Sequence, residues 1–136
     1  MSSALYPKAA QKFGEAVFDW VSHDIRLALM GSGYTYSVAH EFYSDLSDVI
    51  GTPVSLAGKT NTSGVYDADD VTFVGLTGSA VYRGILYKWT GAAGTSPLIF
   101  YIDSDRAVAL PFTPNGLNFV WQFDNGPNKI FKLEVG

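Results

Sequence analysis

The chain is 136 residues long, contains no cysteine and carries a formal net charge of −4. That length suits a single domain over residues 1–136 with its own core, and the lack of cysteine excludes disulfides, thiolate catalysis and cysteine-based metal sites. Because no two Lys or Arg residues are adjacent, phosphate neutralisation is weak, and we expect neither nucleic acid nor an anionic membrane surface as a partner.

A short helix is expected near the amino end, within residues 4–16, as part of an N-terminal arm that spans residues 1–20. Pro7 suits the first helical turn, and Gly14 suits the end of a helix. Apolar residues recur at four-residue steps, as one face of a helix requires: Leu5, Ala9 and Phe13. The pattern leaves two roles open, because the helix either plugs one end of a sheet or belongs to an arm that docks on a partner.

Polar residues interrupt this amino-terminal segment, which never forms the continuous apolar stretch of a signal peptide. No stretch of the chain reaches the ~20 apolar residues of a membrane-spanning helix. We therefore expect a soluble protein that is made in the cytoplasm of its host cell.

Residues 21–136 are predicted to form a β domain. Strand-like runs follow one another with turn residues between them. They occupy residues 25–30, 52–57, 65–74, 80–89, 98–102, 117–123 and 129–135. Residues 34–50 show no clean period, although residues 40–46 favour one helical turn.

The pattern of buried faces predicts how some strands pair. Large apolar residues occupy every second position from 117 to 123, which indicates a strand with one buried face. This run and residues 129–135, joined through turn residues 125–127, are predicted to form a carboxy-terminal hairpin. Residues 98–102 are apolar throughout and favour a strand covered on both faces. The predicted fold class is mostly β, an antiparallel β-sandwich or barrel with a short N-terminal helix.

The spacing of possible metal ligands gives little support for a metal site. His40 and Glu41 begin like the zinc-protease motif, but that motif needs a second His four residues after the first, where this chain has Ser44. The other histidine is His23, so a histidine-rich metal site cannot form. Both histidines are expected to be polar residues of loops or strand edges.

Three aspartates lie close together at Asp67, Asp69 and Asp70. Counted from Asp67, a calcium loop of the EF-hand kind needs Gly at the sixth position and Glu at the twelfth, where this chain has Thr72 and Gly78. We therefore expect an acidic turn that leads into a strand, and the sequence leaves open whether the cluster binds a cation. No cofactor is expected.

Nucleophilic catalysis is not indicated either. Residues 31–33 (Gly-Ser-Gly) are too short for a nucleophile elbow, and the glycine-rich residues 91–96 lack the Gly-Lys-Ser/Thr end of a phosphate-binding loop. Carboxylate pairs for glycoside hydrolysis depend on distances in space, which the sequence does not give. We expect the protein not to be an enzyme.

The aromatic residues carry the remaining signal. Most are expected in the core by their periodicity: Phe13, Phe73, Phe119, Trp121 and Phe131. Tyr34 and Tyr36 flank a Gly-rich turn, and Trp89 lies beside a Gly/Ala/Thr-rich loop, where aromatic side chains suit a protein interface or a sugar-binding platform. The predicted interface residues are Leu5, Tyr6, Tyr34, Tyr36 and Trp89. A carbohydrate-binding module is an alternative.

Short motifs follow one another in a specific order along nearly the whole chain. They are Ala4-Leu5-Tyr6, Trp20 with residues 24–29, His40-Glu41-Phe42, residues 67–73 (DADDVTF), Leu86-Tyr87-Lys88, residues 95–99 (TSPLI), Tyr101-Ile102-Asp103, residues 113–116 (TPNG), Trp121, Asp124-Asn125-Gly126 and residues 129–133 (KIFKL). This order resembles a family of small proteins encoded among the structural genes of tailed bacteriophages. The resemblance implies a virion-associated structural protein.

Within that context we expect a capsid decoration (cement) protein that binds the outer surface of the major capsid shell. A protein that binds only the assembled shell stabilises it by mass action, so no catalysis is needed. The expected partners are the major capsid protein and further copies of the chain, as a dimer or trimer with closed symmetry. A tail, baseplate or fibre-associated virion subunit is the first alternative.

Overall fold

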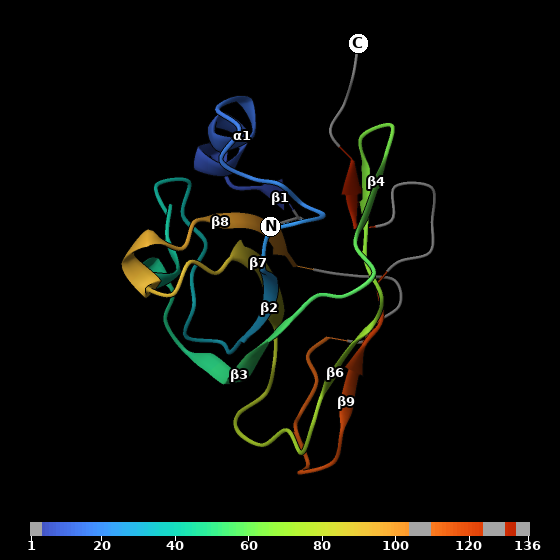
Figure 1. The fold of residues 1–136 in the computed structure, drawn as a ribbon. Coiled ribbons are helices and arrows are strands. Elements are labelled where there is room, and N and C mark those ends of the chain that lie inside the picture. The colour runs from blue at the N-terminus through green and yellow to red at the C-terminus, as the bar shows by residue number, and fades with distance from the viewer. Residues whose placement is uncertain (1–3, 104–109, 124–129, 133–136) are drawn as a thin grey trace.

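Antiparallel pairing organises the chain into three sheets in the computed structural model, which describes residues 4–103, 110–123 and 130–132 (Figure 1). The elements are β1 (Ala4–Leu5), α1 (Pro7–Gly14), β2 (Ile25–Met30), β3 (Val49–Ser55), β4 (Thr60–Thr62), β5 (Val65–Asp67), β6 (Val71–Phe73), β7 (Arg83–Lys88), β8 (Leu98–Ile102), β9 (Phe119–Trp121) and β10 (Phe131–Lys132), with 3-10 turns η1 (Tyr43–Asp45) and η2 (Ala93–Thr95). The sheet orders are β1-β8-β7-β2-β3, β10-β5-β4 and β6-β9. The mostly β, antiparallel fold class is confirmed. The described strands close no barrel, so the arrangement is sandwich-like.

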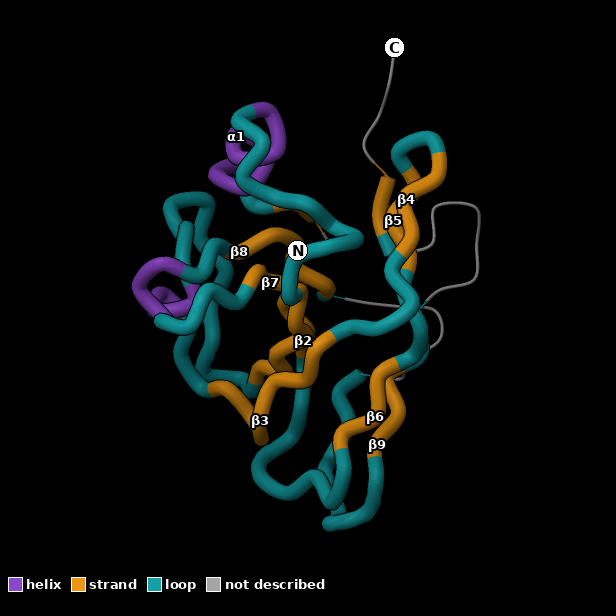
Figure 2. The backbone as a smooth tube through the Cα atoms, viewed as in Figure 1, coloured by secondary structure: helices purple, strands orange, loops and turns teal. Residues whose placement is uncertain are grey.

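Strand β2 is an interior strand of the five-stranded sheet and pairs with β7 along its whole length and with β3 on its other side (Figure 2). Its side chains alternate between two cores. Leu27 and Leu29 belong to one core, whereas Ala28 and Met30 belong to the other. All four are 0% exposed, so both faces of this sheet are covered.

One face is covered by the two smaller sheets. Their inward side chains are mostly aromatic: Tyr66, Phe73, Phe119, Trp121 and Phe131. Tyr66 and Phe131 stack with ring centroids 4.5 Å apart. The ring of Trp121 lies against Gly84 of β7, where an added Cβ would come within 2.8 Å of it. A glycine at position 84 therefore lets this ring pack directly on the sheet.

The other face is covered by the amino-terminal residues, which corrects the expectation of an arm outside the β domain. β1 extends the sheet, with Ala4 opposite Tyr101 of β8. Tyr6 and Ala9 are 0% exposed, and the Tyr6 N–H donates to the Ile99 carbonyl at 3.1 Å. The physical reason lies in β8, which is buried on both sides and needs this cover. Of the two roles left open for the helix, the structure favours the plug.

The predicted carboxy-terminal hairpin is wrong. β9 pairs with β6, placing Trp121 opposite Val71, and β10 pairs with β5, placing Phe131 opposite Tyr66. The turn residues 125–127 predicted for it lie outside the described residues, as do residues 133–135 of its second strand. Aromatic packing onto the large sheet thus outweighs the short connection between neighbouring runs.

Two further strand predictions need correction. The run 65–74 is two strands in different sheets, because the turn at residues 68–70 breaks it. Leu117 is 68% exposed, so the buried alternation begins only at Phe119.

Other predicted elements are confirmed. These are the strands 25–30 and 98–102 and a helix that starts at Pro7 and ends at Gly14. Among helices of the described residues, none is long and apolar enough to cross a membrane.

Deleting residues 1–12 is expected to destabilise the fold rather than only a binding function. The deletion removes the buried Tyr6 ring and one edge strand, so the free energy of unfolding should fall by about 3 kcal/mol or more. Urea denaturation measures this change. Lys8→Ala, at an exposed position, is the control and should stay within about 0.5 kcal/mol of the parent. An unchanged midpoint in the deletion would restore the arm interpretation.

Candidate interaction surface

Most of the residues predicted to meet a partner lie inside the domain. Tyr6 and Tyr34 are 0% and 1% exposed. Tyr36 stacks on Tyr6 with ring centroids 5.0 Å apart and lies 4.9 Å from the ring of Tyr101. Leu5 packs against the core, partly buried. We call Tyr6, Tyr34, Tyr36 and Tyr101 the tyrosine cluster. The expectation that these tyrosines face outward to meet a partner is therefore wrong, because the rings of the cluster pack against the face of the sheet at β8.

Hydrogen bonds hold the hydroxyl groups of this cluster. The Tyr6 and Tyr34 hydroxyl oxygens lie 2.6 Å apart, and the Tyr34 oxygen lies 2.8 Å from Nδ1 of His40. Burial raises the pKa of Tyr6 and raises that of Tyr34 to about 12. Both hydroxyls therefore keep their protons at neutral pH.

Trp89 has different neighbours. Its ring lies edge-on to Tyr43 and Tyr87, at centroid distances of 6.2 and 6.5 Å, and the Arg26 guanidinium lies 5.1 Å from its centroid. The side chain is partly buried. Tyr36 packs in the tyrosine cluster instead, so the structure does not assemble the predicted aromatic residues into one sugar-binding platform.

The acidic residues 67–70 make structural hydrogen bonds. A carboxylate oxygen of Asp70 accepts the Phe123 backbone N–H at 3.1 Å, and the Asp67 carbonyl accepts the Trp20 indole N–H at 3.1 Å. The Asp69 backbone N–H donates to the Ala57 carbonyl at 2.9 Å. Across residues 4–103, 110–123 and 130–132, no group of three His, Asp or Glu side chains is placed to hold a metal ion.

A cleft of about 350 Å³ lies between the end of α1 and the β4–β5 pair, lined by Phe13, Phe18, Trp20, Asn61 and Tyr66 among others. Its rings are turned toward one another. Trp20 and Tyr66 meet edge to face at 5.3 Å and are 3% and 6% exposed. These two rings therefore offer little free face to a ligand.

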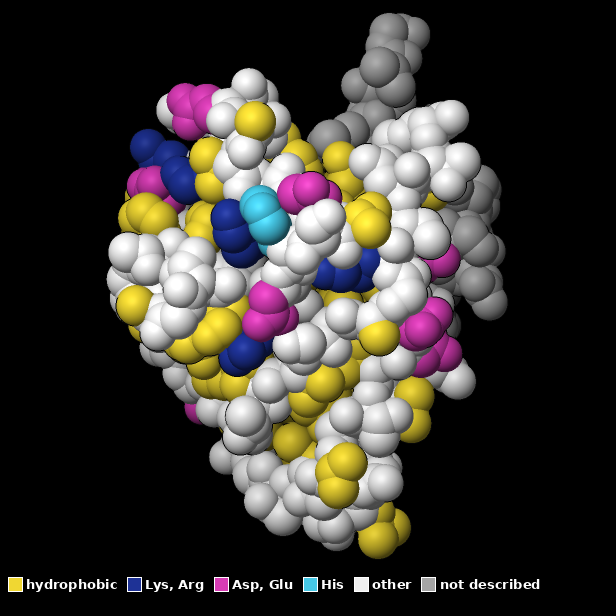
Figure 3. Space-filling view, in the orientation of Figure 1, with side chains coloured by type: hydrophobic (Ala, Val, Ile, Leu, Met, Phe, Trp, Pro, Cys, Tyr) yellow, Lys and Arg dark blue, Asp and Glu magenta, His cyan; other side chains and the backbone are white. Residues whose placement is uncertain are grey.

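Three segments that lie together at one end of the described structure carry no charged residue. Residues 49–58, 71–82 and 110–123 contain no Asp, Glu, Lys, Arg or His, although the chain has 24 such residues elsewhere (9 Lys and Arg, 13 Asp and Glu, 2 His). These segments carry β3, β6 and β9, which lie together at the end away from α1 (Figure 1). On the face drawn in Figure 3, this end shows only hydrophobic and uncharged side chains. We call these three segments the uncharged end.

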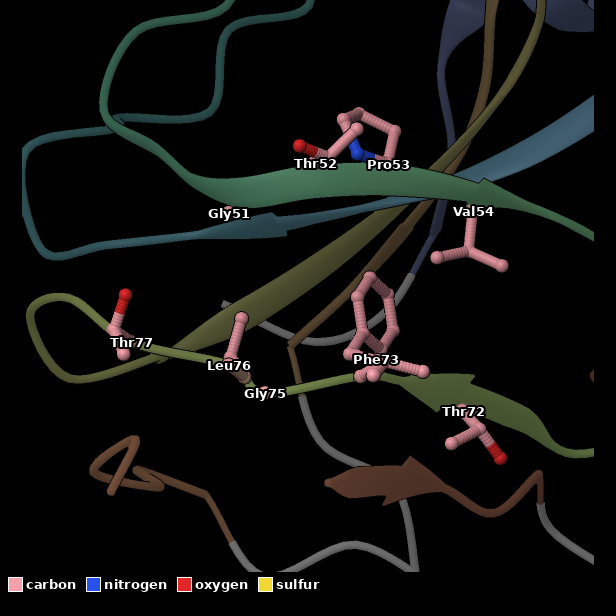
Figure 4. A pocket seen from close by; sticks show the side chains of 10 residues that line it. Gly51, Thr52, Pro53, Val54, Thr72, Phe73, Gly75, Leu76 and Thr77 are labelled. Atoms are coloured by element: carbon pink, nitrogen blue, oxygen red, sulfur yellow. The ribbon is translucent and has the colours of Figure 1, made fainter. Parts of the chain in front are cut away.

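A groove of about 500 Å³ crosses the uncharged end between β3 and residues 72–77. Figure 4 shows Val54 pointing into it from β3, with Phe73 and Leu76 pointing toward it from the opposite side. Phe73 and Leu76 are 2% and 4% exposed, so their apolar side chains form the floor of the groove. Among the residues that the structure describes, those that line it carry no charge.

Three large apolar side chains stand on the surface beside this groove. Val74, Leu117 and Val120 are 81%, 68% and 44% exposed. Val120 lies opposite Thr72 in the β6–β9 ladder, and both point away from the core. Depletion of charge with exposed apolar side chains is the composition found at the centre of protein interfaces. The uncharged end is therefore the candidate interaction surface.

The groove is not built for the addition of a further strand. Residues 51–53 of β3 bulge opposite Ala28 of β2, where the register shifts. Pro53 lacks an N–H, and a bulge interrupts an edge ladder, so both features oppose strand pairing along β3. A partner would therefore meet β3 through side chains rather than through backbone hydrogen bonds.

No protein-family model matches this chain, and no curated protein sequence matches it. None of the predicted interface residues belongs to this surface. Its signal in the sequence is the absence of charge from three separate segments, and only the fold brings those segments together.

Gly51→Ala is expected to destabilise the protein and to disturb the groove. Gly51 has φ of +69°, and an added Cβ would lie 2.7 Å from Cδ1 of Leu76. The backbone strain costs about 1–3 kcal/mol, and Leu76 must also move. Gly94→Ala is the matched control because a Cβ there meets nothing within 4 Å. Thermal and urea unfolding of both variants test this, and equal stabilities would contradict it.

Proposed function

We propose that this protein is a bacteriophage virion subunit, a capsid decoration protein that attaches through its uncharged end to the outer surface of the major capsid shell. The observation that carries the proposal is the exposure of Val74, Leu117 and Val120 near a groove with an apolar floor, in segments that contain no charged residue. The order of motifs along the chain supports the virion context.

The physical driving force is apolar burial. Covering a Val or Leu side chain contributes about 1.5–3 kcal/mol relative to leaving it in water. Association costs several kcal/mol of lost freedom, so three such side chains and the groove support a modest affinity for each copy. The absence of charge removes the cost of taking unpaired ions out of water.

Many equivalent sites turn a modest affinity into a stable coat. Because each bound copy favours the assembled shell over its disrupted form, the stabilisation adds up over the sites. A dimer or trimer that places several uncharged ends on neighbouring capsomers would strengthen attachment further by raising the effective concentration.

The engagement of both histidines supports a role without catalysis. Nδ1 of His40 pairs with the Tyr34 hydroxyl, and Nδ1 of His23 accepts the Asp19 backbone N–H at 2.9 Å. Each imidazole therefore has one nitrogen committed to a structural contact. Tyr34 is 1% exposed and Asp19 contributes a backbone N–H, so neither contact presents an accessible nucleophile to a substrate.

Replacing exposed valines tests the attachment surface. Val74→Lys and Val120→Lys place a charge in the proposed contact and should lower the affinity for particles about tenfold or more, with little effect on folding because both positions are exposed. Val38→Lys is the matched control, since Val38 is 63% exposed and lies outside the uncharged end. Co-sedimentation of each variant with particles stripped of the protein gives the affinities.

Cryo-electron microscopy of the same particles distinguishes the possible locations. The proposal predicts many copies on the outer capsid surface. A few copies confined to the tail, baseplate or fibres would overturn the decoration role and favour the alternative virion subunit. Equal binding by Val74→Lys, Val120→Lys and the parent protein would overturn the assignment of the contact surface.

A further inference from the structure

Three side chains form a relay that fastens the amino-terminal residues to the loop between β2 and β3. Tyr6 lies between β1 and α1, while Tyr34 and His40 belong to the loop. The Tyr6 and Tyr34 oxygens are 2.6 Å apart, and the Tyr34 oxygen is 2.8 Å from Nδ1 of His40. A second link joins the same two segments, since the Lys12 ammonium lies 2.6 Å from the Glu41 carboxylate.

The number of hydrogen atoms decides whether this relay is satisfied. Its two contacts accommodate two hydrogens. When His40 is neutral with Nδ1 unprotonated, Tyr34 donates to Nδ1 and Tyr6 donates to Tyr34, so both hydroxyl hydrogens are used. When Nδ1 carries a proton, three hydrogens compete for two contacts. One buried hydroxyl then loses its acceptor, because Tyr6 and Tyr34 are 0% and 1% exposed.

We propose that this relay is an acid-sensitive latch, which holds residues 4–14 on the sheet while His40 is neutral and releases them when His40 is protonated. Release separates Tyr6 from Tyr36, whose rings now stack, and uncovers the edge of β8 that pairs with β1. The latch is independent of the partner that the uncharged end binds.

The charged and titratable groups around His40 affect the equilibrium between the latched and the released form. Tyr34 contacts it directly, and the neighbouring Glu41 is paired with Lys12 of α1. The Asp45 carboxylate attracts a protonated His40 and so opposes release.

Two further groups define the conditions for a test. The backbone N–H groups of Phe42 and Glu41 donate to Asp45 and lower its pKa, so Asp45 stays ionised above pH 5. From β7, the Arg83 guanidinium donates to the Tyr34 carbonyl at 3.1 Å and lies 3.6 Å from the Asp103 carboxylate. Arginine keeps its charge throughout, so neither Asp45 nor Arg83 changes its charge between pH 5 and 7.5.

The direction of the pH effect follows from proton linkage. The latched form excludes the proton on Nδ1, whereas the released form accepts it, so release takes up a proton. Histidine changes charge between about pH 5 and 8. The latch should therefore be closed at pH 7.5 and weakened at pH 5.

Hydrogen exchange of the full-length protein tests the latch at the backbone N–H groups of Ala9 and Ala10, which donate to the Tyr6 carbonyl at 2.9 and 3.1 Å. After correction for the intrinsic pH dependence of exchange, their protection should fall about tenfold from pH 7.5 to pH 5. Protection of β2 should not change, because the core stays folded.

Two variants make the test specific. His40→Gln supplies an acceptor that does not titrate, so protection at Ala9 and Ala10 should no longer depend on pH. His23→Gln replaces the other histidine and should behave like the parent. If His40→Gln does not fold, Tyr34→Phe removes the relay and should abolish the pH dependence as well. A parent protein with constant protection, or a variant that keeps the full pH dependence, would overturn the proposal.

Discussion

Strand β2 is buried along almost its whole length and is hydrogen-bonded on both sides, to β7 and to β3. Apolar side chains leave it toward both faces of the sheet, so neither face can be left to water. Both faces must therefore be covered by other parts of the chain. The β10-β5-β4 and β6-β9 sheets cover one face, and the tyrosine cluster with residues 4–14 covers the other.

The two covers differ in chemistry, and this difference organises the surface. The tyrosine side brings hydroxyl groups into the core, which must be paired, and His40 pairs with the Tyr34 hydroxyl. The β6–β9 pair covers its face with Val71 and three aromatic rings and brings in no hydroxyl group, although the buried indole N–H of Trp121 has no hydrogen-bond partner among the described residues. Its outer side is free to carry apolar residues, and the uncharged end is the result.

The sequence predicted elements that local chemistry determines. The start of the helix was predicted from its proline, and the positions of β8 and β2 were predicted from their apolar runs. Each of these signals depends on nearby residues only. Pairing partners were not predictable in the same way. Residues 117–123 precede a turn motif, which predicts a hairpin with the next run. Phe119 and Trp121 pair with β6 instead. The reason is packing near Gly84 and Leu27, which exists only in the assembled sheet.

The candidate interaction surface likewise combines features that are visible in the sequence with features that depend on the fold. Tyr6, Tyr34 and Tyr36 were predicted as interface residues, but their positions in the sequence do not reveal that their rings pack inward. The lack of charge in residues 49–58, 71–82 and 110–123 is visible in the sequence, whereas their meeting at one end of the molecule depends on non-local contacts. Burial, not residue type, separates the structural aromatics from the exposed apolar surface.

Hydroxyl-radical footprinting of the protein, free in solution and bound to intact particles, measures most directly which surface meets the partner. The account predicts strong protection on binding at Leu117 and at Val74 and Val120, with unchanged labelling at Val21 and Val38, which are exposed outside the uncharged end. Protection at Val21 or Val38, with labelling of the uncharged end unchanged, would contradict it.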